Sequence, residues 1–489
     1  MIIHPQTRLW SASKAMKPLE EKDQEIPEAK WGVLVYFASD NDLYKFQSRN
    51  LRDLEKVGSS PEMHIVAQMD HGPEKGATLR YYITKSENPS SIQSPVIANL
   101  GMDVDAADPK VLKEFVAFSM RNYPAEHYLL VLNGPGAGFL GGLPDQGSGK
   151  KMSLPQMREA LEEAQEETGR KLDIIGFDSS LMAQAEVAYE LKSAGDILLG
   201  SEECEWGPGW QYDHIFGAKT LAEVQAILGK KQDIGPEELA RKIVSEQEEH
   251  QDYIPTFSAS RLSEMGELRE ASDNLARAIL EVQSPEEKDV IRRTVANVQH
   301  YGGNIAPFKD YRDLGHLAKL ISRTAGISPA VKDAAHHVEA TLRNTVIATQ
   351  ATNDGYDDST GLSVYLPYTK GNQDHGYADT QWAKDTLWDE ALESLARISP
   401  PVRATPPPAS PLKGGREIGA SPASGLRDGA SPASGLRDGW GLPRFGAKRW
   451  SLPRFGARRW GLPRFGAKRR GLPHLGRERD WGLPFPSRT

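Results

Sequence analysis

Polar and acidic residues follow each of five apolar segments in the first half of the chain, and chemistry is expected there. They are Asp40, Asn41 and Asp42 after residues 31–38, Asp70 and His71 after 63–69, Asn133 and Gly134 after 127–132, Asp178, Ser179 and Ser180 after 172–177, and Glu202, Glu203 and Glu205 after 196–201. In an open parallel sheet, ligands bind outside the carboxyl ends of the strands. A rim this acidic favours a cationic ligand such as an Arg or Lys side chain, although any single loop carboxylate can equally be just solvated.

The five apolar segments have the composition of short buried strands, rich in β-branched and aromatic residues. A further strand, LRYYIT (79–84), is expected at an edge of the sheet. Helices are predicted at 43–57, after the Asp108-Pro109 start signal, up to about residue 168 from a capping box of Ser153 and Gln156, and at 181–194. Strands that alternate with helices predict an α/β fold with a mostly parallel sheet covered on both faces.

The composition divides the chain into four regions. Residues 1–30 read as a flexible lead-in, 31–234 as the α/β domain, 235–397 as a mainly helical companion subdomain, and 398–489 as a proline-rich linker with a basic tail. In the companion region, helices are predicted around 262–283, 329–349 and 381–396, and a strand at 361–367. The tail repeats GASPASGLRD twice and then a decapeptide such as GLPRFGAKRW. Units this short and rich in Gly and Pro cannot bury a core, so we expect the tail to be disordered.

Composition excludes several classes of protein. Cys204 is the only cysteine, so disulfides within the chain and a cysteine-rich metal site are excluded, and the twelve histidines form no HExxH or HxH motif of a zinc hydrolase. From Pro401 onward the chain carries 18 Lys and Arg against 5 Asp and Glu, a charge of +13, and the remainder carries 41 against 62, a charge of −21. The basic tail, with four tryptophans, is therefore a candidate for nonspecific contact with nucleic acid, weighed against a tail that is simply solvated.

Nothing in the sequence predicts a membrane segment. No run of about 18 apolar residues occurs, and the first 25 residues lack the apolar core of a secretory signal. We therefore expect a cytoplasmic protein, with secretion as the alternative if the start of the chain is misassigned.

Several strings make the chain resemble the clostripain family of cysteine peptidases. They are YFASDNDL (36–43), YPAEHYLLVLNG (123–134), IIGFDSSLMAQAEVAYELK (174–192), GSEECEWGPGWQY (200–212), KDYRDLGHLAKLI (309–321) and GLSVYLPY (361–368). The likeness covers about residues 31–397. It implies a caspase-like α/β/α sandwich whose sheet carries a His–Cys catalytic dyad.

The resemblance also shows that both dyad positions are replaced. The family's histidine ends a strand in a segment like LxLWxHGxG, where this chain has Gly134, and its cysteine lies in FDxCLM, where this chain has Ser180. A serine hydroxyl depends on an adjacent general base, and Gly134 supplies none. His71 lies on the same predicted rim and is the candidate for a substitute base. Loss of both dyad members leaves only residual binding and oxyanion effects.

The resemblance keeps one specificity residue. Asp178 stands two residues before the nucleophile position, where the family has the acid that selects basic residues, and we add Glu203 and Glu205 as candidate substrate-binding residues. The alternative for Asp178 is a helix cap, and Ser179 and Ser180 are read as helix caps before Leu181. Cys204 is read as a small packing residue rather than as a relocated nucleophile.

The predicted function is an inactive peptidase relative, a pseudoenzyme that binds Arg- or Lys-containing peptides or proteins in an acidic groove. The alternatives are an active endopeptidase that uses Ser180 or another nucleophile, and a decayed gene product without a selected role. No cofactor is predicted, although the family resemblance allows calcium. The family matures by cutting a loop after a basic residue, for which Lys150 and Lys151 are the candidates, and without a nucleophile this cut is not expected.

Overall fold

The computed structural model describes residues 26–396 apart from 73–75, 89, 103, 218–233, 248–252, 304–306, 353–354 and 368–375. The expected flexible lead-in up to residue 25 and the expected disordered tail from residue 398 lie outside the described residues. The described residues belong to one compact unit.

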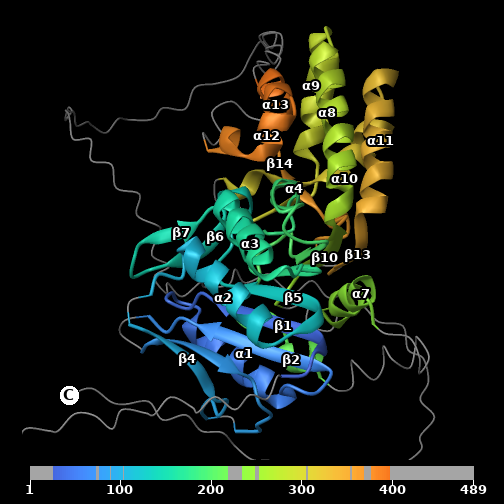
Figure 1. Ribbon diagram of the computed structural model, residues 1–489. Coiled ribbons are helices and arrows are strands. Elements are labelled where there is room, and N and C mark those ends of the chain that lie inside the picture. Colours follow the sequence, from blue (N-terminus) through green and yellow to red (C-terminus); the bar gives the residue numbers. More distant parts are fainter. Residues whose placement is uncertain are drawn as a thin grey trace, which may run out of the picture. The chain divides into compact units, whose positions relative to one another are not determined.

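A nine-stranded sheet forms the centre of the fold (Figure 1). Its five middle strands are parallel, and the two strands at each edge are antiparallel to their neighbours. From one edge to the other the strands are β13 (Val346–Ala351), β10 (Thr256–Arg261), β9 (Ile197–Gly200), β8 (Ile174–Asp178), β5 (Ala125–Asn133), β1 (Ala29–Phe37), β2 (Met63–Met69), β3 (Thr78–Tyr82) and β4 (Val96–Gly101).

Helices cover both faces of this sheet, as the alternation of elements predicts. One core cluster packs α1 (Tyr44–Val57), α5 (Tyr212–Ile215) and α7 (Pro236–Gln247) on one face, and another packs α2 (Pro109–Asn122), α3 (Leu154–Thr168) and α4 (Ala185–Glu190) on the opposite face. Successive residues of β1 enter the two clusters in turn, Val33 and Val35 on one side and Leu34 and Tyr36 on the other, because side chains alternate across a strand. The chain is thus a three-layered α/β/α sandwich.

Two of the predicted helix starts are confirmed in detail. The Asp108 side chain accepts a hydrogen bond from Lys110 N, with Pro109 in the first helical position of α2. Ser153 and Gln156 form the reciprocal capping box of α3. Each cap satisfies backbone N–H groups that the helix itself leaves unpaired.

The helix predicted at 181–194 is wrong at both ends, since α4 spans only Ala185–Glu190. Leu181 N donates to Glu203 O and Ala183 N to Ser201 O, so this stretch bonds to the segment that follows β9 instead of forming a helix. Leu181 has a φ of 68°, in the left-handed region that a non-glycine residue rarely adopts. The prediction that Ser179 and Ser180 are helix caps is therefore also wrong.

The second half of the chain is mainly helical. Its helices are α8 (Met265–Glu281), α9 (Pro285–Ala296), α10 (Leu314–Arg323), α11 (Pro329–Thr345), α12 (Gln381–Asp385) and α13 (Trp388–Ala396). A small sheet of β11 (His300–Tyr301), β12 (Tyr311–Asp313) and β14 (Ser363–Tyr365) accompanies them. In the first half, β6 (Gly142–Asp145) and β7 (Lys150–Met152) form a separate hairpin.

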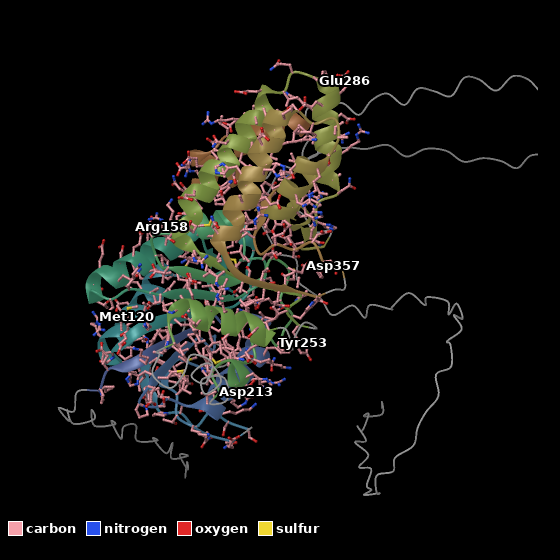
Figure 2. The ribbon with its side chains drawn as sticks, turned by 90° about the vertical axis from the view of Figure 1, so that its right-hand side faces the viewer. Met120, Arg158, Asp213, Tyr253, Glu286 and Asp357 are labelled. Atoms are coloured by element: carbon pink, nitrogen blue, oxygen red, sulfur yellow. The ribbon has the colours of Figure 1, made fainter. Side chains whose placement is uncertain are left out.

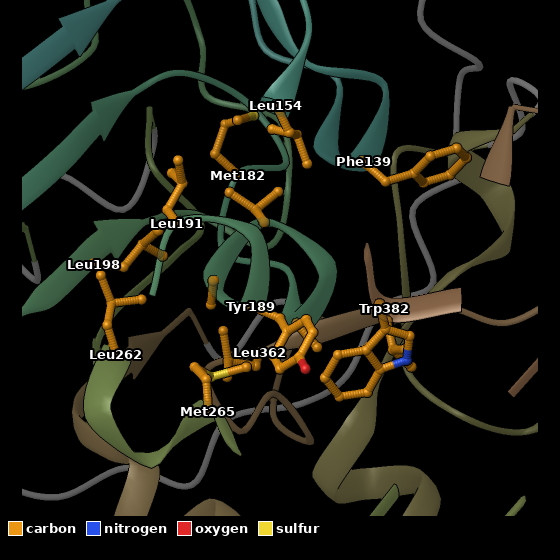
Figure 3. Close-up of a cluster of buried hydrophobic side chains, with 14 of the residues drawn as sticks. Phe139, Leu154, Met182, Tyr189, Leu191, Leu198, Leu262, Met265, Leu362 and Trp382 are labelled. Carbon is orange, nitrogen blue, oxygen red and sulfur yellow. The ribbon is translucent and has the colours of Figure 1, made fainter. Parts of the chain in front are cut away.

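The expected boundary between residues 234 and 235 falls inside one compact unit. Strands β10 and β13 of the second half complete the central sheet beside β9. Figure 3 shows Tyr189 of α4 against Trp382 of α12, whose rings meet edge to face at 5.6 Å between centroids. The two halves therefore share a sheet and a hydrophobic core. Among the described residues, no helix is long and apolar enough to cross a membrane.

Glu186 provides a stability test for this shared core. Its buried carboxyl accepts hydrogen bonds from Tyr365 N and Tyr377 OH, both 2.9 Å, and burial raises its pKa to about 7. Because the pKa of Glu186 is higher in the folded than in the unfolded state, folding favours the protonated carboxyl. This contribution to stability is fully present below the unfolded-state pKa and is lost as pH rises through about 7. We expect wild type to lose stability between pH 4.5 and 7.5 relative to Glu186→Gln, by at most about 3 kcal/mol. Denaturant unfolding at several pH values measures this. The exposed Glu166→Gln serves as control, and equal pH profiles for Glu186→Gln and wild type would contradict the assignment.

Candidate functional site

A small cavity opens at the carboxyl ends of β5 and β8. These strands are adjacent and parallel, and Asn133 lies opposite Asp178. Gly134 and Ser180, the two predicted dyad positions, follow directly and both line the cavity. Residues of α1 and of the loop after β9 complete its wall. The free space is about 30 Å³, which is room for about one water molecule.

Asp178 is held at this cavity by three donors. Its Oδ2 accepts from Asn133 Nδ2 and, at 2.8 Å, from Tyr212 OH, and its Oδ1 accepts from Trp210 N at 3.2 Å. Asn133 Oδ1 in turn accepts from Gln47 Nε2 at 2.8 Å. The network joins α1, β5, β8 and the loop after β9, and it leaves the carboxyl only 6% exposed.

Glu205 places a second carboxyl against Asp178. Both Glu205 oxygens are buried and accept no hydrogen bond, and among the described residues no ion pair joins Lys, Arg or His to either acid. Burial raises the pKa of Asp178 to about 6. Burial and the neighbouring Asp178 raise the pKa of Glu205 well above its usual range. Two neighbouring buried carboxyls resist being ionised together, so the pair favours a state that shares a proton, and no cation among the described residues balances the remaining charge.

Ser180 makes hydrogen bonds with the backbone of Glu205. Its Oγ accepts a hydrogen bond from Glu205 N at 3.0 Å and donates to Glu205 O at 3.4 Å. Among the described residues, no histidine lines the cavity. Gly134, at the histidine position, donates its N–H to Asp178 O. A β-carbon built there would meet Leu143 Cδ2 at 3.2 Å, so an imidazole would require Leu143 to shift.

His71 is not brought to Ser180. It lies at the end of β2, three strand intervals from β8, which is roughly 14 Å. Its Nδ1 is 3.2 Å from Tyr44 OH and its Nε2 is 3.3 Å from Tyr81 OH. A substitute dyad of His71 and Ser180 is therefore not formed in this structure.

Other rim acids serve the fold. Glu203, predicted to bind substrate, does not line the cavity: its Oε1 accepts from Cys204 N and Gly302 N, and its Oε2 from Tyr356 OH at 3.0 Å. Glu202 is buried beside Asp313, which raises its pKa further than burial alone. Asp40 and Asp70 accept from backbone N–H groups of neighbouring loops. Of the predicted rim carboxylates, only Asp178 and Glu205 line the cavity.

Ser179 and Cys204 complete the immediate surroundings. Ser179 Oγ donates to Gly134 O, which ties β5 to β8 beyond the last ladder bond. Cys204 lies next to Ser180, and burial, with Glu203 and Glu205 nearby, raises the pKa of its thiol to about 12. Because the thiolate is the nucleophile, this thiol is poorly suited to replace the cysteine that the family resemblance expects at position 180.

The loop that carries Lys150 and Lys151 forms the hairpin of β6 and β7. Lys150 Nζ pairs with Asp105 at 2.9 Å on the surface, and Gly149 N donates to Asp145 O across the turn. Among the described residues, no group of three or more His, Cys, Asp or Glu is placed to hold a metal ion. Within this part of the chain, the calcium that the family resemblance allows has no cluster of three acidic side chains to bind it.

Sequence reasoning missed the residues that hold Asp178. Gln47, Trp210 and Tyr212 received no role, although GPGWQY lies in a string that carries the family resemblance. Gly209 also matters here: it has a φ of 58°, and a β-carbon on it would lie 2.3 Å from Asp178 Oδ1. The signal available in the sequence was the pair Gly209-Trp210, which closely follows the acidic residue Glu205.

Comparison with known proteins gives consistent matches. The Clostripain family model matches residues 35–395. Clostripain of Hathewaya histolytica is 25% identical over an alignment of 452 positions, and the match covers 78% of this chain and 83% of that protein. A secreted C11 cysteine protease of Bacteroides thetaiotaomicron, solved with an irreversible peptide inhibitor, superposes with a TM-score of 0.55 at 22% identity, over 74% of this chain and 100% of that one.

An inactive zymogen C11 protease of Parabacteroides distasonis gives a TM-score of 0.54 at 20% identity, over 73% of this chain and 98% of that one. At these identities the solved structures show a shared fold. They confirm the predicted caspase-like α/β/α sandwich with a mostly parallel sheet.

The single thiol allows a direct test of the cavity's chemistry. With its pKa at about 12, we expect Cys204 to react with iodoacetamide at pH 8 at least a hundredfold more slowly in the native protein than in guanidinium. Mass spectrometry of the intact chain counts the added groups without ambiguity, because no other cysteine exists. Native labelling as fast as that of the unfolded chain would mean that Cys204 is an accessible, activated thiol.

Proposed function

We propose that this chain, which belongs to the clostripain family of peptidases, binds peptides through an Arg or Lys side chain and does not hydrolyse them. One observation carries the proposal. The cavity at the ends of β5 and β8 holds a buried, uncompensated negative charge but no histidine and no reactive thiol among the described residues that line it.

The absence of turnover follows from the chemistry of Ser180. A hydroxyl becomes an effective nucleophile only when a neighbouring base removes its proton. The hydrogen bonds of Ser180 Oγ are to the backbone of Glu205, and no base is in reach. The loss of an oriented nucleophile and base together removes several orders of magnitude in rate.

Binding of a basic side chain follows from the carboxyl pair. A guanidinium or ammonium group can replace the shared proton and form charge-assisted hydrogen bonds with both acids. The free space of about 30 Å³ suits a group the size of a water molecule or an ammonium, but a guanidinium needs more room. Glu205 is the side chain that can make room, because no donor holds its oxygens.

The first test is for peptidase activity. We expect purified protein to release no product above background from Arg- and Lys-ended fluorogenic peptides, with or without calcium, because Ser180 lacks a base. Clostripain of Hathewaya histolytica provides the active control. Turnover that disappears in Ser180→Ala would contradict the proposal and support a serine-dependent endopeptidase.

The second test is for binding. We expect Asp178→Asn to weaken binding of an arginine-containing peptide by about tenfold to a hundredfold, the usual effect of a lost charged hydrogen bond. Wild-type affinity should rise between pH 5 and pH 7, because a proton competes with the cation until Asp178, with its pKa at about 6, is ionised. Isothermal titration calorimetry measures both.

Asp213→Asn is the matched control for this binding test. It removes one negative charge from α5, where Asp213 pairs with Lys56 at 2.8 Å outside the cavity. Equal affinities for wild type, Asp178→Asn and Asp213→Asn would show that the cavity acids do not recognise the peptide.

A further inference from the structure

Three large aromatic side chains are exposed together at the mouth of the cavity. Trp206 is 61% exposed, Tyr253 41% and Phe46 40%, and they are half of the six large apolar residues that are exposed in the described part of the chain. Figure 2 shows Tyr253 on the same side of the molecule as Asp213 of α5. Apolar side chains that gather on a surface, rather than lie scattered, mark a site of interaction.

Backbone contacts hold these aromatic residues in place. Trp206 N donates to Tyr253 O at 2.8 Å, and Gly209 N donates to Trp206 O at 2.9 Å to close a turn. Asn50 of α1 donates to Pro208 O at 3.1 Å. The turn that presents Trp206 is thus tied to α1 and to the segment of Tyr253.

Phe46 packs against this same turn. A β-carbon built on Gly207 would lie 2.5 Å from Phe46 Cε2, so the ring rests directly on the glycine backbone. Trp206 and Gly207 both line the cavity whose floor carries Asp178 and Glu205. Phe46 and Trp206 therefore form an apolar shelf, which lies next to the acidic cavity.

We propose that Phe46 and Trp206 form a second subsite, which receives an apolar side chain within two residues of the basic residue that enters the cavity. The inference rests on the proposed function. Charge complementarity fixes the occupant, because only a cationic group suits the uncompensated acids, and a peptide that presents one brings its neighbouring side chains over the rim. In an extended peptide, side chains two residues apart lie on one face about 7 Å apart, within reach of a tryptophan that itself lines the cavity.

Exposed aromatic rings add selectivity to such a subsite. An aromatic pair in favourable geometry contributes about 0.5–1.5 kcal/mol beyond burial, which corresponds to about threefold to tenfold in affinity. The pocket acids then select the basic residue, and the shelf selects its neighbour.

A positional scan with the full-length protein tests the inference. The reference peptide is Gly-Gly-Arg-Gly-Gly, and four others carry Phe at each flanking position in turn. We expect one or two positions to gain threefold to tenfold in affinity over the reference peptide, and Phe46→Ala to remove that gain while the reference peptide binds as before. Because Trp206 lines the cavity itself, Trp206→Ala is read only as the ratio of the two affinities, which should fall to about one. The control is Met102→Ala, which truncates an equally exposed apolar residue (52%) beyond β4.

Three outcomes would overturn the inference. The first is a Phe gain that survives both alanine variants, or no gain at any position, with the reference peptide still bound. The second is a concentration-dependent dimer in sedimentation that Trp206→Ala abolishes, with no peptide selectivity, which would make the shelf a contact between two copies of the chain. The third is failure of the reference peptide to bind at all, which would overturn the proposed function as well. In the first outcome the reference peptide still binds, so that outcome overturns the subsite alone.

Discussion

The site depends on a buried carboxyl, Asp178, with which no Lys, Arg or His among the described residues forms an ion pair. Asp178 is stabilised by the donors Asn133, Tyr212 and Trp210, and hydrogen bonds of this kind favour an ionised carboxyl. Burial opposes them and raises the pKa to about 6. These three donors come from β5, from the loop after β9 and from the first residue of α5, so the hydrogen bonds to one carboxylate also fix how these segments meet. Removal of that charge would loosen the geometry as well as change the electrostatics.

The arrangement separates binding from catalysis. In the proposed function, the residues that would attract a basic side chain come from α1, β5, β8 and the loop after β9. The parts that would perform hydrolysis are two single positions, Gly134 and Ser180, which lie on the ends of neighbouring strands. Because catalysis needs both groups within a few tenths of an ångström, it can be lost by two substitutions that leave the surrounding polar network intact.

Sequence patterns predicted the elements that have strong local signals. The parallel strands, the capped starts of α2 and α3, and the place of Asp178 at a strand end all follow from apolar runs and cap residues. Strands β10 and β13 were not predicted as strands because TFSASR and VIATQA are short and largely built of small or polar residues, and their position is set by pairing with β9. Glu203 does not line the cavity, because its carboxyl accepts hydrogen bonds from Cys204 N, Gly302 N and Tyr356 OH. Gly302 and Tyr356 lie about a hundred residues or more further along the chain, so a local pattern could not reveal these contacts.

The left-handed conformation of Leu181 has a consequence for the stiffness of the site. Such a conformation costs a non-glycine residue about 1–2 kcal/mol. Leu143, which lies beside Gly134, has the same kind of conformation, with a φ of 53°. Both side chains are 1% exposed, so burial in the hydrophobic core is what offsets the cost. The shape of the polar cavity is therefore maintained by close hydrophobic packing beneath it. A loss of packing at either leucine would first make the entrance of the cavity more mobile, before it weakened any hydrogen bond.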